Sequence, residues 1–326
     1  MSHGVPVKAT IRRDIPSMNI LLSFTDSYSL YAGVTFSSIL KHCSVPVHFF
    51  LLSQDISQEN KDRFLKVLAD YPQASADFVK LDESQLNEVR AIYQKISKPL
   101  IHISTLYRLY AADILPESID SVLYLDTDTL VRGDIAGLAD LVFDEDIALY
   151  AVPDEFRMLD YHRIHRSQKS HVYFNAGVML INLAYWRKHA VRQKCLEFLS
   201  ENIDSCPFMD QDLLNAVCAT KAGHLHQKYN FIAKHADLQS VIDNVPYDYF
   251  DAALEARENP IVVHYACQPR PWYKDQKAPY ADEWMSYIDS SVWRDVFKPR
   301  YSQGSFLAYC WFWVKNIRKN LKKIHI

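Results

Sequence analysis

Glycine is scarce in this chain of 326 residues. Only seven glycines occur, and no two of them are separated by a single residue. Neither a Gly-x-Gly-x-x-Gly dinucleotide fingerprint nor a Gly-x-x-x-x-Gly-Lys-Ser/Thr phosphate loop can therefore be written from them. If the protein holds a phosphate group, a metal ion or side chains must do so in place of a glycine-rich loop.

Cysteine pairs and long apolar runs are also lacking. The six cysteines show neither Cys-x-x-Cys pairing nor the His/Cys spacing of a zinc site. The first 18 residues contain no apolar core of a secretory signal. The longest uncharged run near either end, residues 301–314, is too short to span a bilayer. We expect a cytoplasmic protein with reduced thiols.

The charge balance excludes one large class of partner. Net charge is −3, but residues 301–326 carry five basic side chains and no acid. The remaining 300 residues hold 31 basic and 39 acidic side chains, a net of −8. A body this acidic is unsuited to binding nucleic acid through phosphates. With 49% hydrophobic and 23% charged residues, the chain has an ordinary globular composition.

Short apolar runs alternate with segments of helical periodicity. In the first half we expect strands at 19–24, 46–52, 76–81 and 121–125, and helices at 29–43, 57–71 (with Ser57 as its N-cap) and 104–115. In the second half we expect strands at 147–152, 172–182 and 261–265, a long helix around 186–203, a shorter one from Asp210, and a loop-dominated region at 225–260. The alternation predicts a single α/β domain with a mixed, mostly parallel sheet over residues 19–300, where ligands bind beyond the carboxyl ends of the strands.

Two carboxylates follow one of these strands. The segment 121–125 ends in Asp126-Thr127-Asp128, so both acids lie at the expected ligand edge and can approach one hard cation. The alternative is a strand-end turn with solvated acids. His264 closes another apolar strand and is placed to add a nitrogen ligand, although a lone histidine is more often structural. Two carboxylates and one imidazole suit Mn²⁺ better than a structural zinc site, with Mg²⁺ as the alternative ion.

Two further segments carry polar groups that local structure does not fully explain. Asp210, Gln211 and Asp212 begin a helix; acids there can simply cap it, but Gln211 is not needed for a cap. Asn175 precedes an Ala-Gly pair inside an otherwise bulky strand. Small residues at that place indicate either close approach of a ligand or backbone, or a β-bulge.

Together these motifs resemble the family 8 glycosyltransferases, which are retaining enzymes. The resemblance covers residues 19–275 through six ordered segments: 21–40, 102–116, 121–135, 173–187, 210–215 and 262–272. It is strongest toward the bacterial lipopolysaccharide and lipooligosaccharide α-galactosyltransferases and glucosyltransferases. The resemblance implies a GT-A type nucleotide-sugar-binding domain.

The resemblance also implies roles for particular residues. Asp126, Asp128 and His264 would bind Mn²⁺, which holds the diphosphate of a UDP-sugar. Other residues expected to bind the donor are Ser23, Thr25, Asp26, Tyr28, Arg108, Thr127, Asn175, Ala176 and Arg270. Gln211 would stabilise an oxocarbenium-like state, and Asp210 is the alternative as a nucleophile. His102 and Asp154 fall at positions where the family contacts the donor and acceptor sugars.

The chain departs from the family pattern at a few positions. Thr25-Asp26 replaces the usual acidic pair or Asn-Asp, which leaves open which of the two contacts uracil. Cys267 and Arg270 replace a usual glycine and lysine after His264. Arginine still binds phosphate, and does so through two hydrogen bonds, whereas Cys267 alters a loop in which glycine can serve a backbone contact.

The C-terminal segment 301–326 carries a second signal. On a helical wheel its apolar residues, among them Trp313, Ile317 and Leu321, share one face, and its five bases lie largely opposite. A basic amphipathic helix of this kind is typical of segments that lie in an anionic membrane interface. The alternative is a helix packed on the body. We expect residues 306–324 to contact the membrane and residues 1–18 to be a flexible extension.

The sequence thus predicts a cytoplasmic retaining glycosyltransferase on the inner face of the membrane. It would transfer galactose, or alternatively glucose, from a UDP-sugar to a lipopolysaccharide-type glycan that is itself lipid-linked. Two other functions use the same residues. One is a metal-dependent UDP-sugar hydrolase or phosphoesterase, and the other is a UDP-sugar-binding docking protein without turnover.

Overall fold

The computed structural model describes residues 17–96, 101–154, 172–245 and 247–302. The strands and helices expected from periodicity are largely found in the first half: β1 (Met18–Ser23), α1 (Ser29–His42), β2 (Val47–Leu52), α2 (Gln58–Leu68), β3 (Ala74–Val79) and β4 (Ser121–Leu125). The helix α3 (Glu83–Tyr93) was not expected. Ser57 is the N-cap of α2, and its side chain accepts a hydrogen bond from the Asn60 amide. β1 begins at Met18, inside the expected N-terminal extension.

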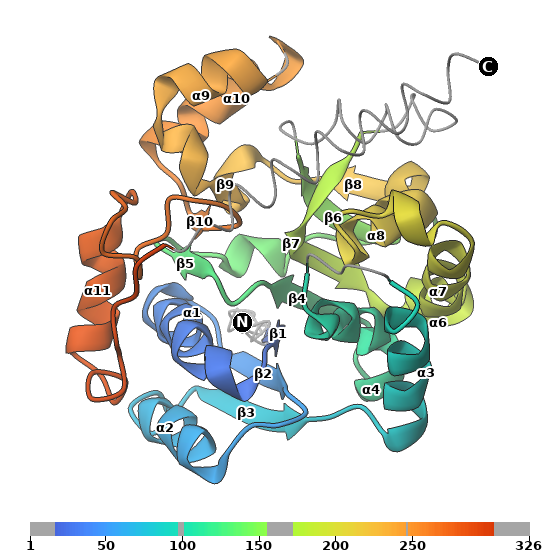
Figure 1. Ribbon diagram of the computed structural model, residues 1–326, viewed down its shortest axis with the longest axis horizontal. Coiled ribbons are helices and arrows are strands. Elements are labelled where there is room, and N and C mark those ends of the chain that lie inside the picture. The colour runs from blue at the N-terminus through green and yellow to red at the C-terminus, as the bar shows by residue number, and fades with distance from the viewer. Residues whose placement is uncertain (1–16, 97–100, 155–171, 246, 303–326) are drawn as a thin grey trace, which may run out of the picture.

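A seven-stranded sheet carries the site, in the order β3-β2-β1-β4-β7-β6-β8. The strands β6 (Leu149–Pro153), β7 (Phe174–Asn182) and β8 (Ala222–His224) complete it. β7 runs antiparallel to both β4 and β6, whereas the other neighbouring pairs are parallel. The start of β7 therefore lies at the same edge of the sheet as the ends of β1, β4 and β6 (Figure 1). The predicted mixed, mostly parallel sheet is confirmed.

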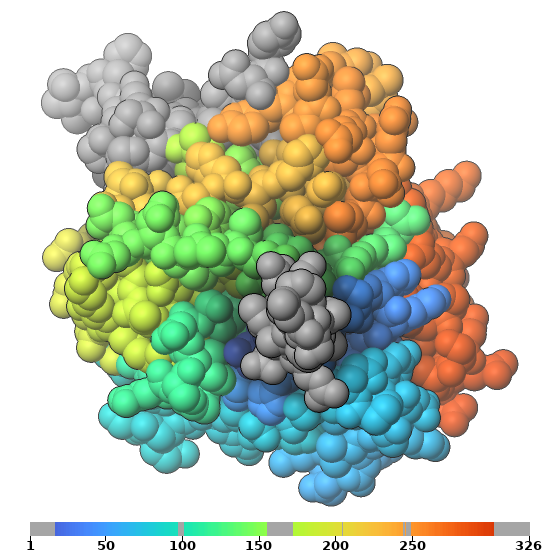
Figure 2. All heavy atoms as spheres, turned by 180° about the vertical axis from the view of Figure 1, so that it is seen from behind, coloured from blue at the N-terminus to red at the C-terminus, as the bar shows by residue number. Residues whose placement is uncertain are grey.

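Alternation along the strands builds a hydrophobic core on each face of the sheet. Ile20 and Leu22 point into one core, which is covered by α1, α2 and α11 (Ala281–Asp289). Leu21 points into the other, which is covered by α3 and by α4 (Ala111–Ile114), α6 (Leu183–Lys188), α7 (Val191–Glu201) and α8 (Asp210–Cys218). Seen from behind, the two sets of helices occupy opposite flanks of the molecule (Figure 2). The layered α/β arrangement keeps the carboxyl edge of the sheet free for a site.

A second, three-stranded sheet lies beside the first. Its order is β5-β10-β9, formed by β5 (Thr129–Val131), β10 (Val262–His264) and β9 (Phe231–Ile232). The expected strand at 261–265 is present, but it pairs with β5 and β9 rather than with the main sheet. Because β5 follows directly after Asp128, this pairing brings the end of β10 to the end of β4.

One expected helix is of a different type, and two expectations about helices were wrong. The helix expected at 104–115 is mostly a 3₁₀ helix, η2 (Ile103–Tyr110), followed by the short α4. The helix expected around 186–203 is two helices, α6 and α7, separated by Ala190 in the left-handed conformation at φ 50°. The region 225–260 is not loop-dominated: it contains α9 (Leu238–Asn244) and α10 (Tyr247–Glu258).

Tertiary contacts explain the break between α6 and α7. The Arg187 guanidinium donates hydrogen bonds to four backbone carbonyl oxygens at the end of α4 and just after it, those of Ala112, Leu115, Pro116 and Ile119. These bonds anchor α6 to α4, and the chain turns at Ala190 before α7 packs against α8 and η2. Neither glycine nor proline marks that turn in the sequence.

Candidate active site

A cavity of about 680 Å³ opens at the carboxyl edge of the main sheet. Residues that line it come from the ends of β1 and β4, the start of β7, the start of α8 and the end of β10. The sequence-predicted site residues among them are Ser23, Thr25, Tyr28, His102, Arg108, Asp126, Asp128, Asp154, Asn175, Ala176, Asp210, Gln211, His264 and Arg270. Residues far apart in the sequence are thus brought into one hollow.

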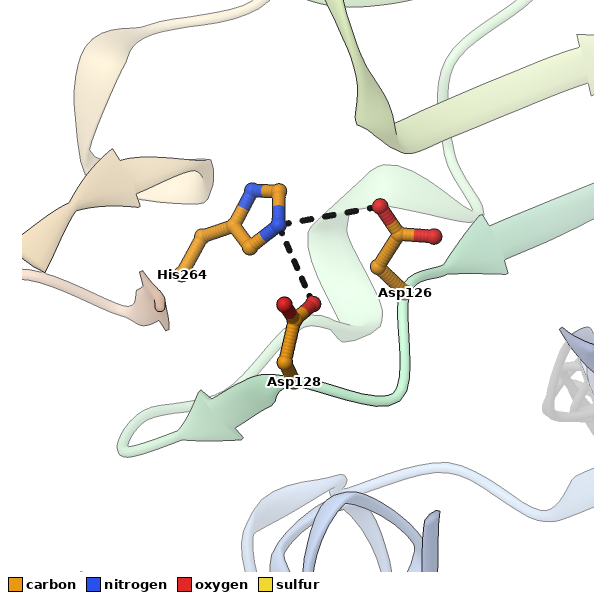
Figure 3. Close-up of side chains that lie close together, drawn as sticks. All are labelled: Asp126, Asp128 and His264. Carbon is orange, nitrogen blue, oxygen red and sulfur yellow. Dashed lines mark ion pairs between the residues drawn. The ribbon is translucent and has the colours of Figure 1, made fainter. Parts of the chain in front are cut away.

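Asp126, Asp128 and His264 converge on one point of this cavity (Figure 3). His264 Nε2 lies 3.2 Å from Asp128 Oδ1 and 3.6 Å from Asp126 Oδ2. One ligand atom from each residue lies within 4.8 Å of the others. Two carboxylate oxygens and an imidazole nitrogen form a donor set that fits Mn²⁺ or a similar divalent ion.

Gly177 makes room for this cluster. A Cβ atom at position 177 would lie 2.1 Å from His264 Cε1 and 2.9 Å from Asp126 Oδ2. Any side chain there would displace the imidazole, so only glycine fits. The small Ala-Gly pair in β7 therefore reflects close approach of two side chains to the strand. A register shift between Ala151 and Pro153 also places an irregularity in the pairing of β6 with β7.

The three groups form a mutually stabilised charge cluster. Burial alone would lower the pKa of His264, but Asp128 and Asp126 outweigh it and raise that pKa. Burial likewise opposes ionisation of Asp128, yet His264 and Arg270 hold the pKa of its carboxyl below the usual value. Asp128 is thus held as a carboxylate at neutral pH, the form that a metal ion requires.

Arg108 connects the candidate metal site to the start of α8. Its Nη2 lies 2.8 Å from Asp126 Oδ1, its Nε lies 3.2 Å from Asp210 Oδ2, and its Nη1 donates to the Ala176 carbonyl oxygen at 3.0 Å. Tyr124 donates a hydrogen bond to the same Asp126 Oδ1 at 2.7 Å. Asp126 Oδ1 is therefore engaged within the protein, and Oδ2 is the oxygen that faces His264.

Asp210 is a buried acid at the first residue of α8. It follows Met209, whose φ of 46° is unusual for a residue other than glycine. Burial raises the pKa of Asp210 to about 6; Arg108 acts in the opposite direction and Asp126 adds to the rise. The strained turn at Met209 and the ion pair with Arg108 thus hold an acid of unusual pKa at the cavity wall.

This shift predicts a pH-dependent stability. Because the pKa of Asp210 in the folded protein lies above the ordinary value of 3.8, its contribution to folding is full below pH 4 and is lost as pH rises through 6. Relative to Asp210→Asn, which has no titrating group here, the wild type should lose up to about 3 kcal/mol between pH 4 and 7.5. Urea unfolding of both proteins in EDTA measures this difference. Parallel pH profiles would show that Asp210 titrates normally.

The side chains of Gln211 and Asn175 both donate hydrogen bonds to the Asp154 carboxylate. Asp154 Oδ2 accepts hydrogen bonds from Asn175 Nδ2 at 3.0 Å and from Gln211 Nε2 at 2.9 Å. Gln211 Oε1 in turn accepts from the Ala176 amide at 3.1 Å. These bonds fix the orientation of three predicted site residues before any substrate is bound.

Two of the predicted donor-binding side chains are placed elsewhere. The Asp26 carboxylate accepts hydrogen bonds from Ser57 and Asn60, which outweigh burial and lower its pKa, and it does not line the central cavity. Thr127 also lies outside the cavity lining, and its carbonyl oxygen accepts from the Thr35 hydroxyl. Thr25 does line the cavity, so of the adjacent pair it is the residue facing the site.

The loop after β10 places Arg270 beside the candidate metal site. Arg270 Nη2 lies 3.6 Å from Asp128 Oδ2, and its Nε donates to the Tyr265 carbonyl oxygen at 3.0 Å. Cys267 also lines the cavity. The replacement of glycine by cysteine at this position is thus accommodated with Arg270 still at the site.

Several cavity or supporting residues were missed by the sequence analysis, among them two charged ones. Asp55 and Lys234 line the cavity, and Asn230 donates and accepts hydrogen bonds behind it. Lys234 and Asn230 fall in the region expected to be loop, where no periodicity assigned them a position. The tail at 303–326 and the segment 1–16 lie outside the described residues.

Comparison with known proteins gives a consistent result. Residues 19–276 match glycosyl transferase family 8. General stress protein A of Bacillus subtilis is 27% identical over 88% of this chain and 98% of its own length. A lipopolysaccharide 1,2-glucosyltransferase of Escherichia coli is 26% identical over 89% of this chain and 83% of its own. A solved structure of the galactosyltransferase LgtC with donor and acceptor sugar analogues is 25% identical, with a TM-score of 0.71, over 85% of this chain and 99% of that one.

Proposed function

Since this chain belongs to glycosyl transferase family 8, we propose that it transfers a hexose from a UDP-sugar to a lipopolysaccharide-type glycan with retention of configuration. Galactose is the first candidate for the sugar and glucose the second, because relatives named for each were found. The observation that carries the proposal is the convergence of Asp126, Asp128 and His264 in one polar cavity.

The metal proposed for this site is Mn²⁺, with Mg²⁺ as the alternative. Asp126 Oδ2, Asp128 and His264 Nε2 would hold it. When bound, the ion supplies Lewis-acid stabilisation of the negative charge that develops on the departing diphosphate. The lack of a glycine-rich loop is consistent with this proposal, because a metal ion that binds the phosphates replaces the backbone amides of such a loop.

The donor nucleotide is proposed to lie along the segment after β1. Ser23, Thr25 and Tyr28 line that part of the cavity, and Asp55 adds a carboxylate there. Arg270 stands beside Asp128, where a guanidinium can bind a phosphate oxygen through two hydrogen bonds.

The transferred sugar is proposed to lie between β7 and α8. Asn175, Ala176 and Asp154 would contact its hydroxyl groups, and His102 would face the acceptor. Gln211 would stabilise the positive charge that develops at the anomeric carbon through its amide oxygen. Asp210 is the alternative as a nucleophile; its pairing with Arg108 favours an electrostatic role.

The acceptor is proposed to be a lipid-linked glycan reached from the cytoplasmic face of the membrane. One relative is named a lipopolysaccharide glucosyltransferase, which supports this class of acceptor. Among the described helices none is both long and apolar enough to cross a bilayer. We propose peripheral attachment through residues 306–324, because their sequence has the pattern of a basic amphipathic helix, with residues 19–300 as the catalytic domain.

UDP release from a panel of UDP-sugars tests the proposal. With Mn²⁺ and a lipooligosaccharide acceptor, one donor should give UDP, and EDTA should lower its rate on the order of 10²–10³-fold. Release that does not depend on acceptor and yields free hexose would favour a hydrolase. Absence of both turnover and calorimetric binding for every donor would contradict the proposed function.

A further inference from the structure

A continuous line of buried polar side chains runs behind the cavity wall. His264 Nδ1 lies 2.9 Å from Asn230 Oδ1, Asn230 Nδ2 lies 2.9 Å from Asn175 Oδ1, and Asn175 Nδ2 lies 3.0 Å from Asp154 Oδ2. His264 and Asn230 are each 2% exposed, and Asn175 and Asp154 are each 6% exposed. The line joins His264, of the candidate metal site, to the Asp154 carboxylate, on the side of the cavity proposed to hold the sugar.

The orientation of Asn175 within this line is determined by its fixed partners. The backbone amide of Gly177 can only donate, and it lies 2.9 Å from one terminal atom of Asn175, which must therefore be Oδ1. The other terminal atom faces the Asp154 carboxylate, which accepts, and must be the amide nitrogen. Both ends give the same assignment.

The orientation of Asn230 follows from that of Asn175. Only a donor can face Asn175 Oδ1, so Asn230 presents Nδ2 to it and turns Oδ1 toward His264. A carbonyl oxygen accepts and cannot donate, so His264 Nδ1 must carry a proton. The only ring nitrogen left to bind a metal ion is then Nε2, which is the atom that faces Asp126 and Asp128.

We propose that Asn230 is a positioning residue that fixes the Nδ1–H tautomer of His264 and so directs Nε2 to the metal. This inference rests on the metal site proposed above. The Asn230 side chain hydrogen bonds to His264 and to Asn175, and it reaches the candidate metal site through the His264 ring. Partners of this kind orient a ligating histidine, and their loss weakens metal affinity.

Two substitutions separate the acceptor from the donor of Asn230. Asn230→Leu keeps the branched shape and removes both hydrogen bonds, whereas Asn230→Asp keeps an acceptor for His264 Nδ1–H and removes the donor to Asn175. Mn²⁺ affinity, measured from the electron paramagnetic resonance signal of the free ion, should fall about 10- to 100-fold in Asn230→Leu. In Asn230→Asp it should stay within about threefold of wild type or become tighter.

Asn182→Leu is the matched control. Asn182 is, like Asn230, a buried asparagine, but it lies at the end of β7 away from the cavity, where it accepts from the Tyr185 amide and donates to the Ile147 carbonyl oxygen. Its loss should lower thermal stability while leaving Mn²⁺ affinity unchanged. A comparable loss of affinity in this variant would show that any buried asparagine has the same effect, and would overturn the specific role of Asn230.

The tautomer itself gives a readout that general destabilisation would not change. In histidine-labelled protein loaded with diamagnetic Zn²⁺, long-range ¹H–¹⁵N spectra should show His264 protonated at Nδ1 in wild type and Asn230→Asp, with Asn230→Leu losing that single state. Protonation at Nε2 in wild type would overturn the inference, and this test holds even if Asn230→Leu fails to fold.

The inference and the proposed function fail in different ways. If wild type and Asn230→Leu bind Mn²⁺ equally, the role of Asn230 is overturned and the metal site stands. If wild type binds no Mn²⁺, the proposed metal site fails, and the positioning role fails with it.

Discussion

Replacing Asp128 with alanine is expected to lower metal-dependent UDP release by on the order of 10³-fold or more. The substitution removes one of three converging ligand atoms, and Asp128 Oδ1 lies 3.2 Å from His264 Nε2. Asp128 is a cleaner target than Asp126, because the Asp126 carboxylate also holds Arg108 and Tyr124. Removing Asp126 would leave the buried Arg108 short of a partner and confound the result.

Asp134→Ala provides the control for this experiment. Asp134 is an exposed acid in the loop after β5, and its carboxylate accepts hydrogen bonds from Ser44. It carries the same charge but does not line the cavity. Turnover and Mn²⁺ affinity, measured by calorimetry, should be nearly unchanged in this variant. Equal activity in Asp128→Ala and wild type would exclude Asp128 as a ligand.

Gly177→Ala is expected to reduce Mn²⁺ affinity by on the order of 100-fold or more, without changing any charge. The added Cβ would lie 2.1 Å from His264 Cε1 and 2.7 Å from His264 Nδ1, so the ring must move. Movement of the ring breaks both its contact with the carboxylates and its hydrogen bond to Asn230. Overpacking should also cost about 1–3 kcal/mol in the free energy of unfolding.

Gly33→Ala separates these two effects. A Cβ at position 33 would lie 2.3 Å from the Trp293 indole, in the core between α1 and the chain after α11. This variant should be destabilised to a similar extent and yet keep its Mn²⁺ affinity. Titration with Mn²⁺ and urea unfolding of both variants provide the comparison. Equal affinity losses would mean that packing damage, rather than displacement of His264, accounts for the effect.

The candidate metal site could be predicted from the sequence, because each of its residues is marked by the few residues before it. Asp126 and Asp128 follow an apolar strand directly, and His264 ends another, so their place at strand ends is visible without knowing the fold. The fold brings the three together, as expected. The identity of a bound ion and of the sugar stays a prediction.

The helices α9 and α10 could not be predicted from the sequence, because packing between them, rather than composition, stabilises them. The region is rich in Tyr, Asp, Asn and Pro, and α9 is short. Val241, Val245 and Ala253 form a small hydrophobic cluster of their own, separate from the two large cores. Such a cluster depends on two helices meeting, which periodicity within either one does not show.

Asn230 escaped the sequence analysis for a related reason. A single asparagine in a polar segment gives no signal, and its partners His264 and Asn175 lie 34 and 55 positions away. Only the pairing of β9 with β10 brings it behind the imidazole. By contrast, Asn175 stood out because small residues follow it in a bulky strand.

The reversed direction of β7 has a consequence for how this protein can diversify. β6 ends and β7 begins at the same edge, and the Asp154 amide donates to the Tyr173 carbonyl oxygen at 2.8 Å, which ties the two ends of the connection together. Because this hydrogen bond and the β6–β7 ladder already fix the two strands, insertions or deletions between residues 154 and 172 would require no change in the register of the sheet. A change of length there would leave the cavity residues at the ends of β1, β4 and β10 in place.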